Sequence, residues 1–436
     1  MKRFYSIATG RNVFINTVLC VVLVLSLSIT VHAEEKPSWA YNAKSYVYQN
    51  GIGGLTRVFI DNVHYNENPV IYVEEYDGSF TLQAKRDIPR ELPLYGGFYA
   101  GAEYNYLFFG QTNKSEDNNA EVIRVVKYSK SWERLGHASV LGANTTEPFR
   151  SGSCRCVEAG GMLYVHTCHQ MYKSNDGLNH QANMTFIVRV GDMAVTSVRA
   201  GISYANTGYV SHSFDQYILA DKEGNIVTLD LGDAYPRAIT LSRFNGMAGS
   251  EKLGTATCSV ILKIDGKIGD NNTGVSIGGF AETDTGYITA YNYKNGTGRS
   301  FYLAYTSKSD LSTKITPLSE SLPTIKAPAL APMGTSGGYV FWKDPRNGAV
   351  QYYALYYADG SIGEIHATDA FVWTSDGGYS YRNASFSQPA LCNGKIVWSV
   401  CRGEAVPMSF SEYNNKTVVF YMLDETGIQT ISLSAE

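Results

Sequence analysis

A short apolar or aromatic segment recurs seven times along this chain, each time after a turn residue. The seven segments are LTRVF (55–59), NYLFF (105–109), GMLYV (161–165), QYILA (216–220), GYITA (286–290), GYVFW (338–342) and GKIVW (394–398). Their second residues follow one another at intervals of 50, 56, 55, 70, 52 and 56 residues. Regular spacing of this kind is typical of a repeat architecture. We attribute the longest interval to an insertion around residues 263–274.

Each repeat unit contains four short β-strand patterns joined by polar turns. A second apolar run follows the recurring segment, as in VIYVEEYDG (70–78), and a third short strand comes next. Another short strand precedes the recurring segment, as in KAPALAPM (326–333). This pattern predicts an all-β fold, a seven-bladed β-propeller of four-stranded antiparallel blades, forming a single domain over residues 38–436. In the fourth unit, Gly232 and Asp233 are predicted to form a turn.

In this arrangement the sequence resembles secreted seven-bladed β-propellers over nearly all of residues 40–436. The resemblance is architectural, because the units lack the Gly-His and Trp-Asp signature of the best-known propeller repeat. Residues 374–381 have the spacing of the Asp-box of sialidase-type propellers, but they fall between the sixth and seventh units. The resemblance implies that loops from strand two to strand three, and loops between units, meet on one ligand-binding face. A β-solenoid and a pair of β-sandwiches are the alternatives, and both fit the spacing less well.

The first 33 residues have the features of a secretory signal peptide. Three basic residues precede an apolar run at 13–31, and the run ends in VHA (31–33), which signal peptidase accepts. We therefore expect cleavage after Ala33 and a secreted or cell-surface protein. The alternative is an uncleaved membrane anchor. No later stretch approaches the ~20 apolar residues that span a bilayer, so we expect no membrane span in the mature chain.

The charge balance disfavours a nucleic-acid partner. Removal of residues 1–33 takes away three of the 36 Lys and Arg residues, and the remaining 33 face 40 Asp and Glu residues, a formal charge of about −7. Nucleic-acid-binding surfaces are basic. The sequence also lacks a P-loop, G-x-G-x-x-G, G-x-S-x-G and H-E-x-x-H. We expect a monomer without a bound cofactor.

Three cysteines and a histidine share one hairpin of the third unit. A three-residue loop centred on Gly161 would make Cys154 face Cys168, and Cys156 face His166, all on one side of the sheet. A two-residue turn at the same glycines would shift the register by one residue and break both pairings. Because the protein is expected to be exported, we favour a Cys154–Cys168 disulfide. The alternatives are a zinc-like site made by all four side chains and buried thiols.

Polar side chains of the third and fourth units are the candidate ligand-binding residues. The segment HTCHQMYKSNDGLNHQ (166–181) is expected to be a strand end followed by a long loop on the ligand face. YVSHSFDQ (209–216), in the neighbouring unit, would bring His212 close to His166 or His169. The candidates are Arg155, His166, His169, His180, His212 and Asp215. Such groups can bind an acidic ligand or support acid–base chemistry, and hydrogen bonding to loop backbone is the alternative for each histidine.

We expect a non-catalytic recognition protein that binds a glycan, a peptide or a protein on the loop face. The sequence is rich in tyrosine, with 32 in the chain, and shows no defined catalytic motif. Tyrosine offers an apolar ring and a polar hydroxyl to a ligand. The alternative is an exported hydrolase or lyase that uses the histidines and Arg155 at the channel mouth, with or without a divalent metal such as zinc.

Overall fold

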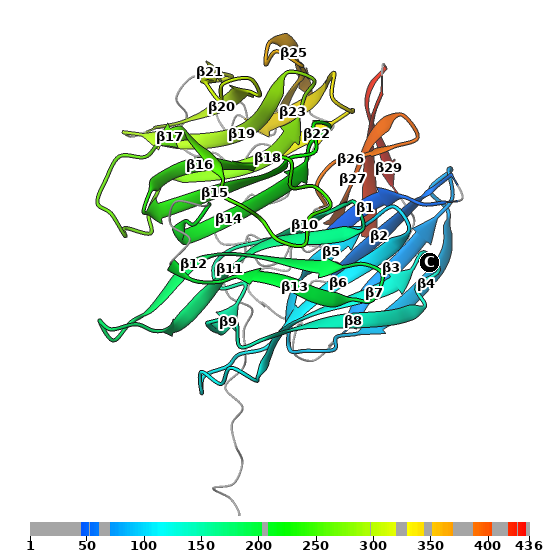
Figure 1. The fold of residues 1–436 in the computed structure, drawn as a ribbon. Coiled ribbons are helices and arrows are strands. Elements are labelled where there is room, and N and C mark those ends of the chain that lie inside the picture. The colour runs from blue at the N-terminus through cyan, green and yellow to red at the C-terminus, as the bar shows by residue number, and fades with distance from the viewer. Residues whose placement is uncertain are drawn as a thin grey trace, which may run out of the picture. The chain divides into compact units, whose positions relative to one another are not determined.

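The computed structural model describes residues 45–51, 53–60, 70–202, 208–296, 298–319, 329–343, 351–368, 387–402, 417–424 and 426–432. The predicted signal peptide (1–33) and the Asp-box-like stretch (374–381) lie outside these residues. Every named element in the described part is a β-strand (Figure 1). Over the same residues, no helix has the length and apolar character needed to cross a membrane.

The strands form five separate four-stranded antiparallel sheets and one nine-stranded sheet. The first sheet holds β1 (Ser45–Gln49), β2 (Leu55–Ile60), β3 (Val70–Tyr76) and β4 (Leu82–Pro89). The second holds β5 (Leu94–Ala100), β6 (Tyr104–Gly110), β7 (Glu121–Ser129) and β8 (Arg134–Leu141). Three more four-stranded sheets follow the nine-stranded one along the chain. The first of them holds β18 (Val275–Glu282), β19 (Gly286–Asn295), β20 (Gly298–Ser307) and β21 (Thr313–Pro317). The next holds β22 (Ala329–Pro332), β23 (Gly337–Lys343), β24 (Gln351–Tyr357) and β25 (Ile362–Thr368), and the last holds β26 (Ala390–Cys392), β27 (Lys395–Arg402), β28 (Thr417–Asp424) and β29 (Gly427–Ser432).

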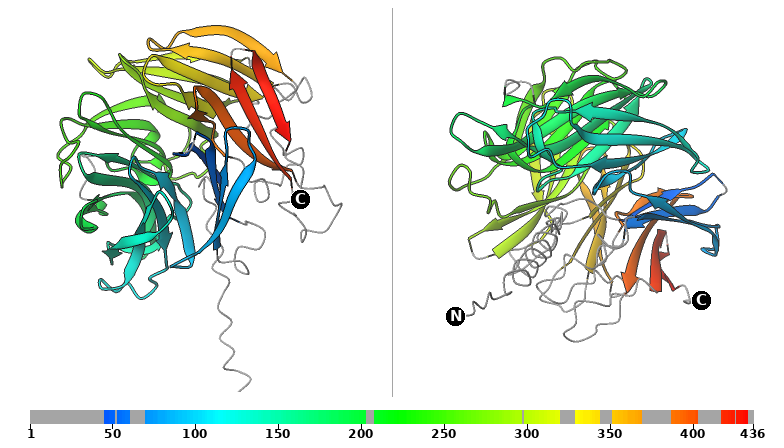
Figure 2. Two further views of the ribbon diagram at one scale, coloured as in Figure 1. Left: turned by 90° about the vertical axis from the view of Figure 1, so that its right-hand side faces the viewer. Right: turned by 90° about the horizontal axis from the view of Figure 1, so that it is seen from below.

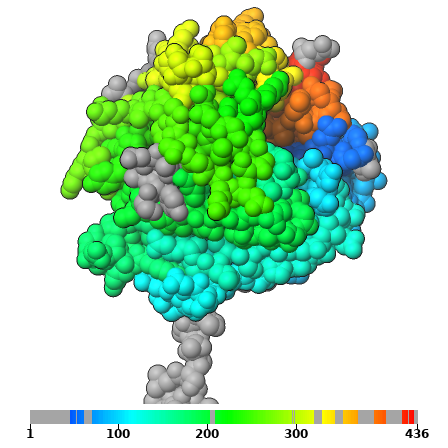
Figure 3. Space-filling view, in the orientation of Figure 1, coloured from blue at the N-terminus to red at the C-terminus, as the bar shows by residue number. Residues whose placement is uncertain are grey.

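The nine-stranded sheet joins the third and fourth predicted units. The third unit holds β10 (Cys154–Ala159), β11 (Met162–Lys173), β12 (Asn179–Arg189) and β13 (Ala194–Arg199). The fourth unit holds β14 (Ser211–Ala220), β15 (Ile226–Ala234), β16 (Arg237–Phe244) and β17 (Thr257–Lys263). One residue pair, Ala182 with Ser211, connects β12 to β14, and β9 (Thr145–Pro148) pairs with the far end of β11. The two units form one continuous surface in the space-filling view (Figure 3).

The strand order and the closure of the chain on itself define a β-propeller. In each four-stranded sheet the strands pair in chain order, as in a meander. Ser45 of β1 forms a parallel bridge with Ser387, just before β26, so the first strand of the first sheet lies beside the start of the last sheet (Figure 2). The structure therefore confirms the all-β propeller class. The predicted seven separate blades are not observed, because pairing between β12 and β14 merges two units.

Burial decreases from the inner strands to the outer edge of each sheet. All residues of β2 and β15 are buried, whereas Ile88 is the one buried residue of β4. Strands covered on both faces carry near-continuous apolar runs, which explains the recurring segments. Neighbouring sheets share apolar cores: Phe108 and Val125 of the second sheet pack in one cluster with Val165 and Phe186 of the third unit.

The predicted insertion at 263–274 is wrong. Six of the recurring segments lie in second strands, but QYILA (216–220) lies in β14, the first strand of the fourth unit. The long interval thus compares non-equivalent strands, and the connection at 264–274 is as long as the one at 200–210. A longer turn instead lies at 245–256, between β16 and β17, where the Tyr164 hydroxyl of the third unit donates to backbone carbonyls of the turn.

Candidate functional site

The β10–β11 hairpin has a two-residue turn. Gly160 and Gly161 have φ values of 57° and 76°, the left-handed conformation that glycine adopts without strain and that matches the twist of a hairpin. Cys154 consequently pairs with Thr167 instead of Cys168. The predicted register is therefore wrong by one residue, and Cys154 and Cys168 are present as two thiols instead of the predicted disulfide.

The residues of the zinc-like alternative are not assembled around a common point. Cys156 pairs with Val165 instead of His166. Both ring nitrogens of His166 are already engaged: Nδ1 lies 2.8 Å from Thr185 Oγ1, and Nε2 lies 3.0 Å from Asp230 Oδ2. Within the described ranges, no group of three or more His, Cys, Asp or Glu side chains is arranged to hold a metal ion.

We expect brief alkylation of the native protein with iodoacetamide to label Cys258 and to spare Cys154, Cys156, Cys168 and Cys392. Cys258 is exposed, whereas the other four are buried. Burial raises the thiol pKa of Cys154 and Cys392 to about 12 and that of the other two well above the ordinary value, and the thiolate is the reactive form. Peptide mass mapping locates the label. If Cys154 and Cys168 stayed unlabelled after unfolding without reductant, they would be disulfide-bonded and this assignment would be wrong.

A buried hydrogen-bond network begins at Asp230 in the middle of β15. His166 lies 3.0 Å from its Oδ2, Asn183 Nδ2 donates to the same oxygen at 3.1 Å, and Ser213 Oγ donates to Oδ1 at 2.8 Å. His166 and Asp230 are completely buried. These four side chains come from four strands, β11, β12, β14 and β15, so the network fastens the third unit to the fourth.

The network continues inward to Arg155. Gln216 Nε2 donates to Ser213 Oγ at 2.7 Å, and its Oε1 accepts the Ser153 backbone N–H at 2.7 Å. Ser153 Oγ donates to Asp215 Oδ1 at 2.9 Å, and Arg155 Nη1 lies 2.6 Å from the same oxygen. Arg155 and Asp215 are thus brought together as an ion pair between β10 and β14. Because each neutralises the other, neither presents an unpaired charge to a ligand.

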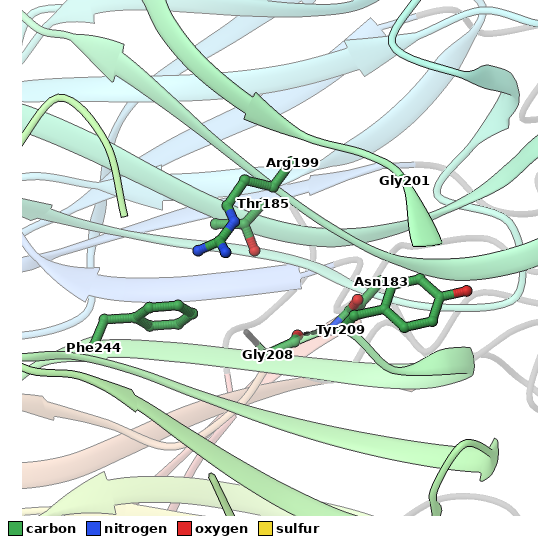
Figure 4. A pocket seen from close by; sticks show the side chains of 7 residues that line it. All are labelled: Asn183, Thr185, Arg199, Gly201, Gly208, Tyr209 and Phe244. Atoms are coloured by element: carbon green, nitrogen blue, oxygen red, sulfur yellow. Dashed lines mark hydrogen bonds between the residues drawn. The ribbon is translucent and has the colours of Figure 1, made fainter. Parts of the chain in front are cut away.

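A small pocket lies next to the Asp230 network and shares Asn183 with it. Its lining residues are Asn183, Thr185, Arg199, Gly201, Gly208, Tyr209 and Phe244 (Figure 4). The cavity volume is about 10 Å³, which suffices for about one water molecule. The pocket is therefore too small to hold a ligand of ordinary size.

His169 lies in the part of β11 that pairs with β9. Its Nδ1 lies 2.7 Å from Thr145 Oγ1 of β9, and burial lowers its pKa to about 3, so the ring is neutral at physiological pH. Strand β9 also explains why the expected long loop is wrong. It pairs with β11 from His169 to Met171 while β12 pairs on the other side, so β11 continues to Lys173 and the loop shrinks to 174–178.

His180 and His212 form a half-exposed pair at the surface. Their rings stack with centroids 6.0 Å apart and an interplanar angle of 26°. His180 Nε2 lies 2.7 Å from Asp176 Oδ2, and His212 Nδ1 lies 3.1 Å from Asp233 Oδ1. The side chains of His180 and His212 are 32% and 27% exposed, whereas Asp233 is completely buried. Contact with the Asp233 carboxylate raises the pKa of His212 above its ordinary value.

The backbone beside this pair is strained. His212 and Tyr235 have φ values of 49° and 46°, a region that side-chain-bearing residues rarely adopt. The β14–β15 register also shifts between Ser213 and Asp215, which indicates a bulge. Strain and bulges of this kind concentrate at functional sites, where they direct a side chain. We define the two-histidine site as His180 and His212 with their carboxylates, Asp176 and Asp233.

Asp230 and Asp233 were not among the residues predicted for the site. Asp233 was predicted in a turn, but β15 continues to Ala234, and the chain turns at Tyr235 and Pro236. Asp230 and Asp233 both lie in a strand whose nine residues are all buried. Two acidic residues in an otherwise apolar strand are a usable signal, because buried carboxylates are rare without partners.

The sequence matches no protein-family model and no curated protein. Among solved structures, the chain is similar to a polysaccharide lyase described as a PL25 ulvan lyase (11% identity, 92% of this chain and 96% of that chain, TM-score 0.49). It is also similar to the BP39L lectin from Burkholderia pseudomallei (12% identity, 90% and 96%, TM-score 0.47) and to an endo-arabinase from Bacteroides thetaiotaomicron (16% identity, 64% and 94%, TM-score 0.34). Because these likenesses are weak, the propeller assignment rests on the strand pairings of the chain itself.

Proposed function

We propose that this chain is an exported β-propeller protein that binds a ligand at the two-histidine site, with a glycan as the ligand. The observation that carries this proposal is the stacked, half-exposed pair of His180 and His212, each held by a carboxylate. The imidazole rings and the exposed Asp176 carboxylate supply both donors and acceptors, as a polyhydroxylated ligand requires. Tyr235, two residues after Asp233, is 74% exposed and offers a ring for stacking against an apolar sugar face.

We further propose that the two halves of the nine-stranded sheet count as two blades, which gives seven. Each half contains four antiparallel strands in chain order, and a single pair between Ala182 and Ser211 joins β12 to β14. The buried Asp230 network also links the two halves. It does so through polar side chains, in addition to the single residue pair.

A hydrolase or lyase is the second candidate, favoured by the pKa of His212. Contact with Asp233 raises the pKa of His212, which favours its proton-donating form in a site that also holds the ring of His180. Incubation of a bound glycan with the protein separates the two functions, because an enzyme shortens the glycan chain and a lectin-like protein leaves it intact.

An array of polysaccharides and peptides tests the proposed binding. We expect the wild-type protein to bind a subset of glycans and His212→Gln to lose at least about tenfold in affinity, the effect of roughly 1.4 kcal/mol. His137→Gln is the matched control, because this exposed histidine lies on β8, outside the two-histidine site. If His212→Gln bound as tightly as the wild type, or if peptides alone were bound, the proposal would be wrong.

A further inference from the structure

A second concave site lies beside the β15–β16 hairpin, which carries Asp233. It has a volume of about 380 Å³, within the range of roughly 300–1,000 Å³ that is usual for ligand sites. Its walls come from the connection at 264–274 and from the end of β19. The lining residues are Asp265, Gly266, Asn272, Thr273, Gly274, Tyr293, Lys294 and Gly296. We call this site the β19 pocket.

Arg237 fixes the shape of one wall of the β19 pocket. This buried side chain donates from Nε to the carbonyl of Asp265 at 3.1 Å, from Nη1 to that of Asp270 at 2.5 Å, and from Nη2 to that of Asn272 at 3.0 Å. These three contacts of the Arg237 side chain are all with backbone carbonyls. A loop held in this way is preorganised, so a ligand does not have to order it on binding.

The same connection is anchored to the end of the β15–β16 hairpin, close to Asp233. The Gly269 N–H donates to the backbone carbonyl of Asp233 at 3.1 Å, and the Ile264 N–H donates to that of Arg237 at 3.1 Å. Asp233 and Arg237 are themselves paired across the β15–β16 turn. One turn thus positions the carboxylate behind His212 and also the arginine that shapes the β19 pocket.

We propose that the β19 pocket is a second subsite for the same ligand, and that the ligand is an oligosaccharide chain spanning both sites. This inference rests on the proposed function. The pocket lining combines a carboxylate, an amide, a hydroxyl, an ammonium group and the ring of Tyr293. Such a set hydrogen-bonds sugar hydroxyls and covers an apolar ring face. Two subsites positioned by one hairpin favour a chain over a single sugar, since the second contact forms within an already bound molecule.

Binding of labelled oligosaccharides of increasing length tests this inference. The probes are mono-, di-, tetra- and hexasaccharides of xylan, arabinan, polygalacturonate and alginate. The double variant Asn272→Ala/Lys294→Ala removes two pocket side chains and leaves the backbone contacts of Arg237 in place. Lys267→Ala is the matched control, because this exposed lysine belongs to the same connection but does not line the pocket.

We expect wild-type affinity to rise with chain length in the series that binds. The double variant should bind the hexasaccharide about tenfold more weakly, a loss of roughly 1.4 kcal/mol, and the monosaccharide almost as well as the wild type. A length dependence that is the same in the double variant and in Lys267→Ala overturns the second subsite while leaving the two-histidine site standing. Absence of binding by the wild type, or binding that His212→Gln does not weaken, instead overturns the proposed function itself.

Discussion

Asp230→Ala is expected to lower the free energy of unfolding by about 3–5 kcal/mol, the usual cost of breaking a buried ionic or hydrogen-bonded pair. The carboxylate is completely buried and contacts His166 at 3.0 Å, Asn183 at 3.1 Å and Ser213 at 2.8 Å. Alanine leaves these polar groups without their partner inside the protein, where each lost hydrogen bond costs about 1–3 kcal/mol. Urea or thermal unfolding followed by circular dichroism measures the loss.

Asp192→Ala is the matched control for Asp230→Ala. Asp192 also forms an ion pair, with Arg189 at 2.8 Å, but its side chain is 57% exposed. Exposed ion pairs are screened by solvent and contribute little to stability, so we expect almost no change. If Asp230→Ala destabilised the protein no more than Asp192→Ala does, the network would not hold the third and fourth units together.

The pKa of His212 should lie above the ordinary histidine value and should fall in Asp233→Asn. The neutral amide cannot stabilise the imidazolium in the way that the carboxylate does at 3.1 Å. A histidine with a raised pKa in the folded state stabilises the fold fully below its unfolded pKa of about 6.5. That contribution is lost as pH rises through the folded pKa. The stability advantage of the wild type over Asp233→Asn should therefore shrink with rising pH.

Histidine resonances followed by NMR across a pH series report the pKa of His212 directly. Chemical denaturation of both proteins over the same series reports the difference in stability. His169, whose pKa is lowered to about 3, contributes a dependence of opposite sign, but it is present in both proteins and cancels in the difference. If the pKa of His212 were unchanged in Asp233→Asn, the Asp233 carboxylate would not act on His212 and would not belong to the two-histidine site.

The affinity for an acidic glycan should depend on the charge of His212. A protonated His212 attracts an acidic glycan, so affinity for polygalacturonate or alginate fragments should increase as pH falls through the raised pKa of His212. Neutral xylan and arabinan fragments should show a weaker dependence, because hydrogen bonding to their hydroxyls needs no net charge.

The repeat rhythm of the chain was enough to predict the all-β propeller class. Segments such as LTRVF (55–59) and GYVFW (338–342) are apolar because their strands are covered on both faces by neighbouring sheets. His212 was expected near His166 or His169, but it stacks on His180. Periodicity along a strand therefore carried the class of fold, but not the contacts of the candidate residues.

The sequence pattern could not decide the strand register or the partners of the polar side chains. The same two glycines, Gly160 and Gly161, permit two registers, and the actual turn makes Cys154 face Thr167. A one-residue change in a hairpin moves every side chain to a new partner, which removed the predicted disulfide.

The sequence by itself determined which strands form, because alternation and turn residues act over a few neighbouring positions. The tertiary structure decided the chemistry of each polar side chain. His166 meets Asp230 across 64 positions of the chain, and no local pattern encodes a contact of that range. Only the folded sheets bring such residues together, bury one histidine in a network and leave His180 and His212 at the surface.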